Sequence, residues 1–304
     1  MKDLGPLHYF LGIEVHPFSG GLFLSQQKYA CNLLAHSSMI GCNPITTPLA
    51  QKHNLRREDD VFVNATNYRS IVNALQYITL TRLDLTHAVN LVCQFMHQPS
   101  ASHFQAIKRI LQYLQGTLDY GLRLLSQSSL SLYGFSEANW AGCPNTRHST
   151  TSYCIYLGIN CISWASKEQA TISRSSAEAE YRSMSSTTIE LTWIMYLLRD
   201  IGLHLSAPPV LFYDNTSALH MIVNSFFHAR TKHIELDVHF VHEKVAASAL
   251  VSRFVPSHLQ FANIFTKALS KTSFHGLQIK IGVVPPPPSS LRGSDKSNKS
   301  LAKV

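Results

Sequence analysis

The pattern of apolar and polar positions changes near residue 130, and this change divides the chain. Before it, an apolar run over Leu7–Val15 and a return over Leu22–Leu24 flank the turn residues Phe18–Gly21, which predicts a hairpin. Apolar residues at helical spacing then predict a mostly helical region. Its helices are expected over Ser25–Leu34, Tyr68–Thr79, Leu85–Met96 and His103–Leu114.

Beyond residue 130, short apolar segments predict the strands of a sheet. The strands are expected over Leu130–Ser136, Thr150–Leu157, Cys161–Ala165, Val210–Tyr213 and Leu250–Val255. Helices are expected over Ser176–Ile201, Asn215–Asn224, Ile234–Val245 and His258–Leu269. Three strands followed by alternating helices and strands indicate an α/β fold.

Two glutamates near the start of the longest predicted helix have different expected roles. Ser175-Ser176-Ala177-Glu178 fits a capping box, which gives Glu178 a structural role. Glu180 shares a helical stripe with Met184 and Leu191, so its charge faces the predicted core. A buried charge is costly unless it is paired or bound to metal. We therefore interpret Glu180 as an inward-facing ligand.

Other oxygen-bearing side chains stand at the ends of predicted elements. Glu137 and Asn139 follow the first strand of the sheet, Asp214 ends the fourth, and Asn263 lies in the last helix. Converging carboxylates are what two Mg²⁺ ions need to clamp a phosphodiester during its displacement. The simpler alternative is that Asp214 only caps the helix that follows it.

Composition narrows the class of protein. The chain has 304 residues, which favours two domains, and its 45% hydrophobic share is sufficient for sizeable cores. No apolar run approaches the roughly 20 residues of a membrane span, and the first residues lack a signal peptide's apolar region. The six cysteines form no CxxC pair, which indicates free thiols in a reducing compartment. We expect an intracellular protein, cytoplasmic or nuclear.

The net charge of +8 favours a nucleic-acid partner and no membrane. Six basic residues are candidates for contacts with nucleic-acid phosphates. The alternative is that they are ordinary surface charges. These residues are Arg147, His148, Arg174, Arg230, Lys232 and His233. His258 precedes Asn263 and is either a proton shuttle or a surface histidine.

Several sequence strings resemble the ribonuclease H of copia-type retrotransposons. They are Asn139-Trp140-Ala141-Gly142-Cys143, Ser173–Tyr181, Tyr213-Asp214-Asn215-Thr216-Ser217-Ala218, His228–Glu235 and Ala262–Leu269. Residues 1–15, with Tyr68–Val72 and Ala74–Tyr77, resemble the end of the reverse transcriptase in the same Pol polyprotein. The resemblance covers about residues 1–292 and has five ordered motifs in the ribonuclease H part.

The resemblance implies an RNase H-like α/β fold, a mixed five-stranded sheet with helices, preceded by a mostly helical reverse-transcriptase remnant with one hairpin. The implied domains are residues 1–125 for the thumb and connection, 128–272 for RNase H, and a disordered Pro/Ser/Lys tail at 273–304. Polymerase activity is not expected, because Asp59-Asp60 is the one Asp-Asp pair and sits in a polar stretch.

The resemblance also implies cleavage of the RNA strand of an RNA–DNA hybrid with Mg²⁺ or Mn²⁺, held by Glu137, Glu180, Asp214 and Asn263. The family has Asp where this chain has Glu137, Asn139 and Asn263. A longer side chain and a lost charge predict weaker binding of a second ion and impaired catalysis. The alternatives are a catalytically inactive nucleic-acid-binding remnant and a non-functional pseudogene product.

Overall fold

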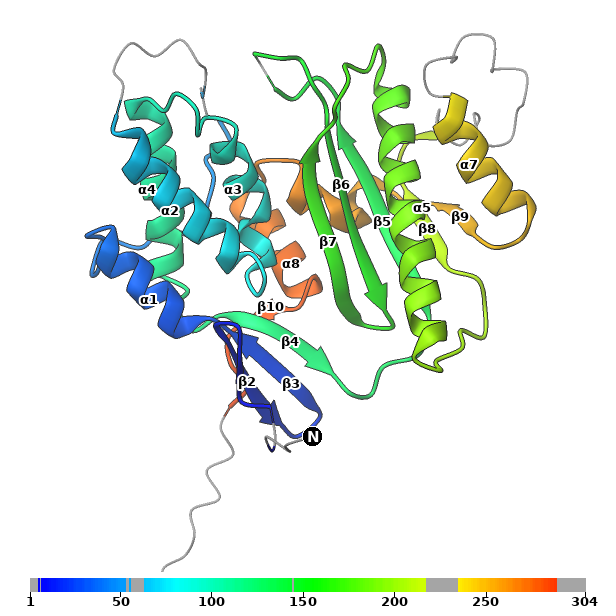
Figure 1. The fold of residues 1–304 in the computed structure, drawn as a ribbon, viewed down its shortest axis with the longest axis horizontal. Helices are drawn as coiled ribbons and strands as arrows, with labels where there is room; N and C mark the ends of the chain where they lie inside the picture. Colours follow the sequence, from blue (N-terminus) through cyan, green and yellow to red (C-terminus); the bar gives the residue numbers. More distant parts are fainter. Residues whose placement is uncertain are drawn as a thin grey trace, which may run out of the picture.

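The computed structural model describes residues 5, 7–52, 55, 63–143, 145–216 and 235–288. Two five-stranded sheets and a group of helices make up the fold (Figure 1). In the part of the chain that is described, no helix is both long and apolar enough to cross a membrane.

The first sheet is antiparallel and contains the predicted hairpin. Its strands are β1 (Tyr9–Phe10), β2 (Ile13–Phe18), β3 (Gly21–Ser25), β4 (Gly121–Leu125) and β10 (Val283–Val284), in that spatial order. The β3–β4 pair requires glycine, since a Cβ on Gly121 would come within 2.3 Å of the Leu24 carbonyl oxygen. The sequence pattern did not predict β4 or β10.

The predicted helices of the first region are present. They are α1 (Gln27–His36), α2 (Ala65–Ile78), α3 (Thr86–Cys93) and α4 (Ala101–Gln115), with the 3₁₀ helix η1 (Leu83–Leu85) before α3. Asn64 starts α2, because its side chain accepts the backbone N–H groups of Thr66 and Asn67. Apolar faces of all four α-helices meet in one core.

The second sheet is mixed, which confirms the predicted fold class. Its strands are β5 (Leu132–Asn139), β6 (Thr150–Leu157), β7 (Asn160–Glu168), β8 (Val210–Tyr213) and β9 (Val251–Phe254), in the spatial order β7-β6-β5-β8-β9. The β5, β6 and β7 pairs are antiparallel, and β8 joins β5 in parallel.

Helix α5 (Ser176–Asp200) crosses the second sheet next to β5 (Figure 1). Gly134 of β5 permits this approach, since a Cβ there would already touch Thr187 of the helix at 3.2 Å. Helix α7 (Glu235–Ala246) then packs on α5. The expected helix over Asn215–Asn224 falls mostly outside the described residues.

The expected single helix over His258–Leu269 is wrong. The segment forms two short 3₁₀ helices, η4 (Ser257–Leu259) and η5 (Phe261–Phe265). Gln260 separates them, because its φ of −77° and ψ of 101° are extended rather than helical. Asn263 therefore lies on η5.

The expected disorder from residue 273 is corrected for the described part of that segment. Helix α8 (Lys271–Lys280) begins at Ser270, whose side chain accepts the Ser273 N–H, and β10 pairs with β4. The physical reason is that Phe274, Leu277 and Ile281 are buried in the main core. The sequence Pro285–Pro288 begins only after these elements.

A buried polar cluster fixes α8 to the helical region. The Asp84 carboxylate accepts hydrogen bonds from Arg82, from the Tyr113 hydroxyl at 2.6 Å and from Gln278 Nε2 at 3.0 Å. The main hydrophobic core continues from the helices through η5 to one face of the second sheet. The division between residues 1–125 and 128–272 therefore stays a prediction.

We expect Phe274→Ala to lower the free energy of unfolding by about 3–5 kcal/mol, because it leaves a cavity beside Tyr113. Chemical denaturation measures this change. Ile279→Ala is the matched control on the same helix, since Ile279 is 62% exposed. Equal effects of the two substitutions would contradict the placement of α8.

Candidate metal centre

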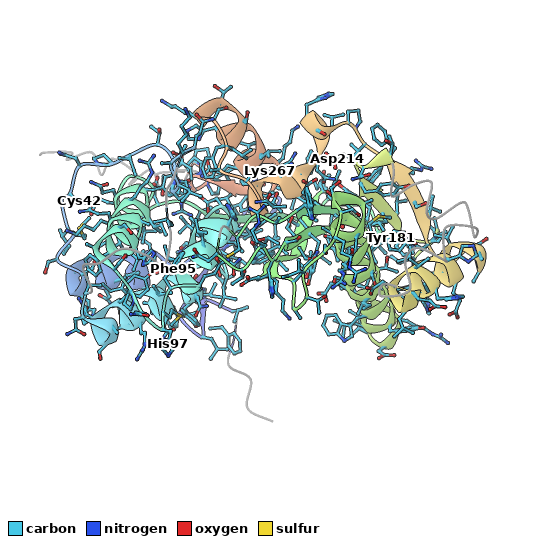
Figure 2. All side chains as sticks on the ribbon, turned by 90° about the horizontal axis from the view of Figure 1, so that it is seen from above. Cys42, Phe95, His97, Tyr181, Asp214 and Lys267 are labelled. Carbon is cyan, nitrogen blue, oxygen red and sulfur yellow. The ribbon has the colours of Figure 1, made fainter. Side chains whose placement is uncertain are left out.

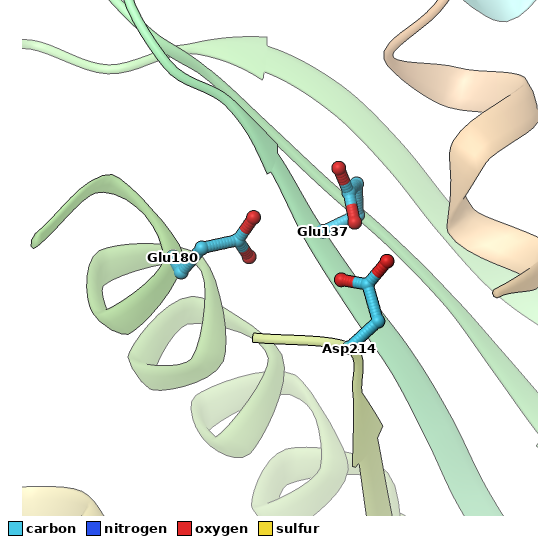
Figure 3. A group of neighbouring side chains, drawn as sticks. All are labelled: Glu137, Glu180 and Asp214. Atoms are coloured by element: carbon cyan, nitrogen blue, oxygen red, sulfur yellow. The ribbon is translucent and has the colours of Figure 1, made fainter. Parts of the chain in front are cut away.

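Three carboxylates from separate elements gather at one end of the second sheet. Glu137 comes from β5, Glu180 from α5, and Asp214 from the residue directly after β8 (Figure 3). One oxygen of each lies within 4.8 Å of the others. Strands β5 and β8 run in parallel and pair Phe135 with Phe212. Glu137 and Asp214 each lie two residues further on, so they stand at the same level.

Glu137 lies deepest in this group, with 2% of its surface exposed. Its Oε1 accepts an ion-paired hydrogen bond from Lys267 Nζ at 2.7 Å. Its Oε2 is buried and has no hydrogen-bond partner among the residues that the structure describes. An unsatisfied buried carboxylate oxygen is costly, so this atom is a candidate ligand atom.

The start of α5 separates the two glutamates as the sequence predicted. Ser175 Oγ accepts the Glu178 N–H, and the Glu178 carboxylate accepts the Arg174 N–H and pairs with Arg182 at 2.9 Å. The side chain of Glu178 is therefore used in the cap. Glu180 instead reaches the sheet, where its Oε2 accepts the Ala138 N–H at 3.1 Å.

Asp214 is connected to Asn263 through Ser257. The Ser257 hydroxyl donates to Asp214 Oδ2 at 2.6 Å, and the Ser257 carbonyl accepts from Asn263 Nδ2 at 2.9 Å. Asn263 Oδ1 in turn accepts from Lys267 Nζ at 2.8 Å. Lys267 and Asp214 are both labelled in the side-chain view (Figure 2). All four predicted oxygen ligands therefore lie in one connected group.

Burial and mutual repulsion raise the pKa of both glutamates. Burial raises the pKa of Glu137 to about 7, although the Lys267 ammonium opposes the shift. Burial, followed by the charges of Glu137 and Asp214, raises the pKa of Glu180 to about 9. Without a further cation, the group therefore holds protons at neutral pH.

The donor set fits a hard divalent cation. Carboxylate oxygens are the ligands that such ions prefer, and the partnerless Glu137 Oε2 is available to one. A bound cation would also offset the burial and the carboxylate repulsion that together keep Glu180 protonated. The carboxylates are thus suited to a divalent cation that prefers oxygen ligands.

The predicted nucleic-acid contacts are placed only in part. Arg147 and Arg174 are exposed, on loops joined by the Trp140 Nε1 hydrogen bond to the Ser173 carbonyl. His148 is half-buried, with Nδ1 3.6 Å from Glu168 Oε1. The remaining three, Arg230, Lys232 and His233, lie outside the described residues, as does Asp59-Asp60.

Sequence reasoning missed Lys267 and Ser257. His258 is exposed on η4, next to Ser257. Lys267 lies four residues after Asn263, within the string that resembles the family. On a helix this spacing would place the two side chains next to each other, and that signal could have identified Lys267. Ser257 had no comparable signal.

Comparison with curated proteins places the chain in a family. It is 46% identical over 290 residues to the retrovirus-related Pol polyprotein from transposon RE1 of Arabidopsis thaliana. This alignment covers 95% of the chain and 20% of the relative. A second match, from transposon TNT 1-94 of Nicotiana tabacum, is 33% identical over 93% of the chain and 22% of the relative. The chain belongs to the copia-type retrotransposon Pol polyprotein family. It spans about a fifth of the length of these polyproteins.

A shorter relative matches about two thirds of the chain. An uncharacterized mitochondrial protein of Arabidopsis thaliana, AtMg00810, is 50% identical over 64% of the chain and 80% of its own length. No protein-family model matches the chain.

Solved structures give weaker likenesses. The foamy viral protease-reverse transcriptase in complex with an RNA/DNA hybrid aligns with 96% of the chain and 32% of its own, at 12% identity and a TM-score of 0.44. The N-terminal RNase H domain of a Mycobacterium tuberculosis protein aligns with 50% of the chain and 98% of its own, at 11% identity and a TM-score of 0.32.

The raised pKa of Glu180 predicts how the metal-free Pol segment responds to pH. In the folded state Glu180 keeps a proton that it loses in the unfolded state above its ordinary pKa of 4.5. The folded state is therefore favoured less as the pH rises toward about 9. We expect the melting temperature in chelator to fall between about pH 6 and pH 8.5. Thermal unfolding followed by circular dichroism measures it.

Glu180→Gln is the control for this prediction, because glutamine cannot titrate. We expect its melting temperature to fall less over the same range. Mg²⁺ should stabilise the unsubstituted chain more at the higher pH, where binding displaces fewer protons. A wild-type slope equal to that of Glu180→Gln would contradict the assignment of the pH dependence to Glu180.

Proposed function

We propose that this Pol segment is a ribonuclease H that hydrolyses the RNA strand of RNA–DNA hybrids with a divalent metal, at a reduced rate. The observation that carries the proposal is the group formed by Glu137, Glu180 and Asp214, whose ligand atoms lie within 4.8 Å of one another. Family membership and the mixed sheet support it.

The chain's own residues divide into ligands and residues that orient them. Glu137, Glu180 and Asp214 would hold the metal, Mg²⁺ or Mn²⁺, with Asn263 as a weak fourth. When bound, a divalent ion stabilises the charge that develops on the phosphodiester oxygens. The Ser257 hydroxyl fixes one Asp214 oxygen, and the Ala138 N–H fixes one Glu180 oxygen. His258 is exposed next to Ser257 and is available to carry a proton.

The reduced rate follows from the two departures from the family that fall among the four proposed ligands. Glu137 is one methylene longer than the aspartate found there, and displacement of a catalytic group by about 1 Å costs on the order of 100-fold in rate. Asn263 supplies a carbonyl oxygen without a charge, and that oxygen already accepts from Lys267. Both changes weaken the hold on metal ions.

A second candidate function is binding of hybrids without cleavage. The observation that favours it is the pairing of Glu137 Oε1 and Asn263 Oδ1 with Lys267. Exposed Arg147 and Arg174 would then contact phosphates together with His148. The same contacts are proposed for Arg230, Lys232 and His233. Binding through such contacts weakens steeply with salt.

The deciding experiment is cleavage of an end-labelled RNA–DNA hybrid in Mg²⁺ and in Mn²⁺. We expect Glu137→Asp/Asn263→Asp to cleave at least about tenfold faster than the natural chain, because both ligands return to the shorter, charged form. Asp214→Asn should abolish cleavage in either background. Chelator should stop all cleavage.

The outcomes separate the two candidates. Equal rates for the natural and doubly substituted chains would show that the site tolerates both residues, and would contradict the reduced rate. Salt-sensitive hybrid binding by both chains, with cleavage by neither, would favour the binding function. Double-stranded DNA is the substrate control.

A further inference from the structure

A half-exposed lysine contacts the edge of the carboxylate group through its ammonium. Lys267 Nζ is 2.7 Å from Glu137 Oε1 and 2.8 Å from Asn263 Oδ1, so it bridges two of the four proposed metal ligands. Its backbone N–H donates to the Asn263 carbonyl at 3.1 Å, which holds the residue close to η5. The ammonium thus has a defined position between these oxygens.

The amide of Asn263 is oriented to receive this ammonium. Its Nδ2 donates to the Ser257 carbonyl at 2.9 Å, which directs its Oδ1 toward Lys267. Ser257 also donates to Asp214 Oδ2 at 2.6 Å. The hydrogen bonds therefore run without a break from Asp214 through Ser257, Asn263 and Lys267 to Glu137.

The arrangement divides the oxygens of Glu137 between two uses. Oε1 accepts from the ammonium, while Oε2 is buried and has no hydrogen-bond partner in the described part of the chain. The partnerless oxygen remains for an ion shared with Glu180 and Asp214, the other members of the group.

Charge balance agrees with this division. Once a bound cation has displaced the protons, the three carboxylates carry three negative charges, Lys267 returns one positive charge, and Asn263 adds none. The remaining two negative charges are neutralised by one divalent ion. A second divalent ion would add two positive charges close to both the first ion and the ammonium, and both would repel it.

We propose that the Lys267 ammonium takes the place of one of the two metal ions, so that this centre binds a single divalent ion through Glu137, Glu180 and Asp214. This inference rests on the proposed function, because it concerns the same metal centre. Lys267 is then a positioning residue, which holds one Glu137 oxygen and orients Asn263.

The test is the stoichiometry of Mn²⁺ binding to the full chain, measured by electron paramagnetic resonance of the free ion. We expect one bound ion for the natural chain. Lys267→Met removes the charge and frees Glu137 Oε1 and Asn263 Oδ1, so we expect a second ion to bind about tenfold or more tighter than to the natural chain. Lys267→Arg keeps the charge and should stay at one ion.

Lys271→Met is the matched control, since Lys271 is exposed at the start of α8 and its loss changes the net charge equally. It should bind one ion. Folding of each variant is checked by circular dichroism, and the stoichiometry of the natural chain tests the proposal even if Lys267→Met does not fold.

Two results would overturn this inference and leave the proposed metal centre standing. One is the binding of two ions of similar affinity by the natural chain, and the other is a folded Lys267→Met that still binds one. Absence of Mn²⁺ binding from the natural chain and from every variant would instead overturn the proposed metal centre, and the inference with it.

Discussion

Burial of like charges is the constraint on which the site depends. Glu137 and Glu180 are 2% and 6% exposed, and Asp214 stands beside them. Separated from water, such a group survives only with compensating contacts. The Ala138 N–H stabilises the Glu180 carboxylate and the Ser257 hydroxyl stabilises that of Asp214, while the Lys267 ammonium brings a full positive charge to Glu137.

The scaffold that holds these contacts is assembled from both halves of the sequence. Lys267 and Asn263 lie on a segment that packs against the helical region as well as the second sheet. Helix α8, directly after that segment, is fixed by Gln278 to Asp84. The buried Arg82–Asp84 ion pair of the same cluster contributes little net stability, but loss of one partner is costly. The helical region therefore affects the metal centre by holding the segment that carries Lys267.

The parts of the site that follow local rules were predictable from the sequence. Glu180 was separable from Glu178 because the Ser175 cap has a recognisable spacing and because a stripe of apolar residues marks the buried face of α5. Strand ends located Glu137 and Asp214. Resemblance to the family identified Asn263 as a ligand. Periodicity alone placed it on a single helix over His258–Leu269, which the structure replaces with two 3₁₀ helices.

The missed parts depend on contacts that are distant in sequence. Lys267 reaches Glu137 only because η5 is a short 3₁₀ helix that lies against β5 and β6, and periodicity cannot give that placement. Strand β10 has two residues, and its pairing with β4 is visible only in the folded sheet. The basic residues beyond Asp214 remain a prediction, since they fall outside the described residues.

The pairing of β10 with β4 has a consequence for the order in which the chain folds. Val283 lies opposite Leu122, so the entire second sheet is an insertion between two neighbouring strands of the first. During synthesis the hairpin of β2 and β3 emerges early, but its sheet lacks an edge strand until the last described element has left the ribosome. Contacts of such long sequence separation slow folding and leave an unpaired edge in the meantime. The edge of β4 in the first sheet therefore stays unpaired until residues 283–284 have been made.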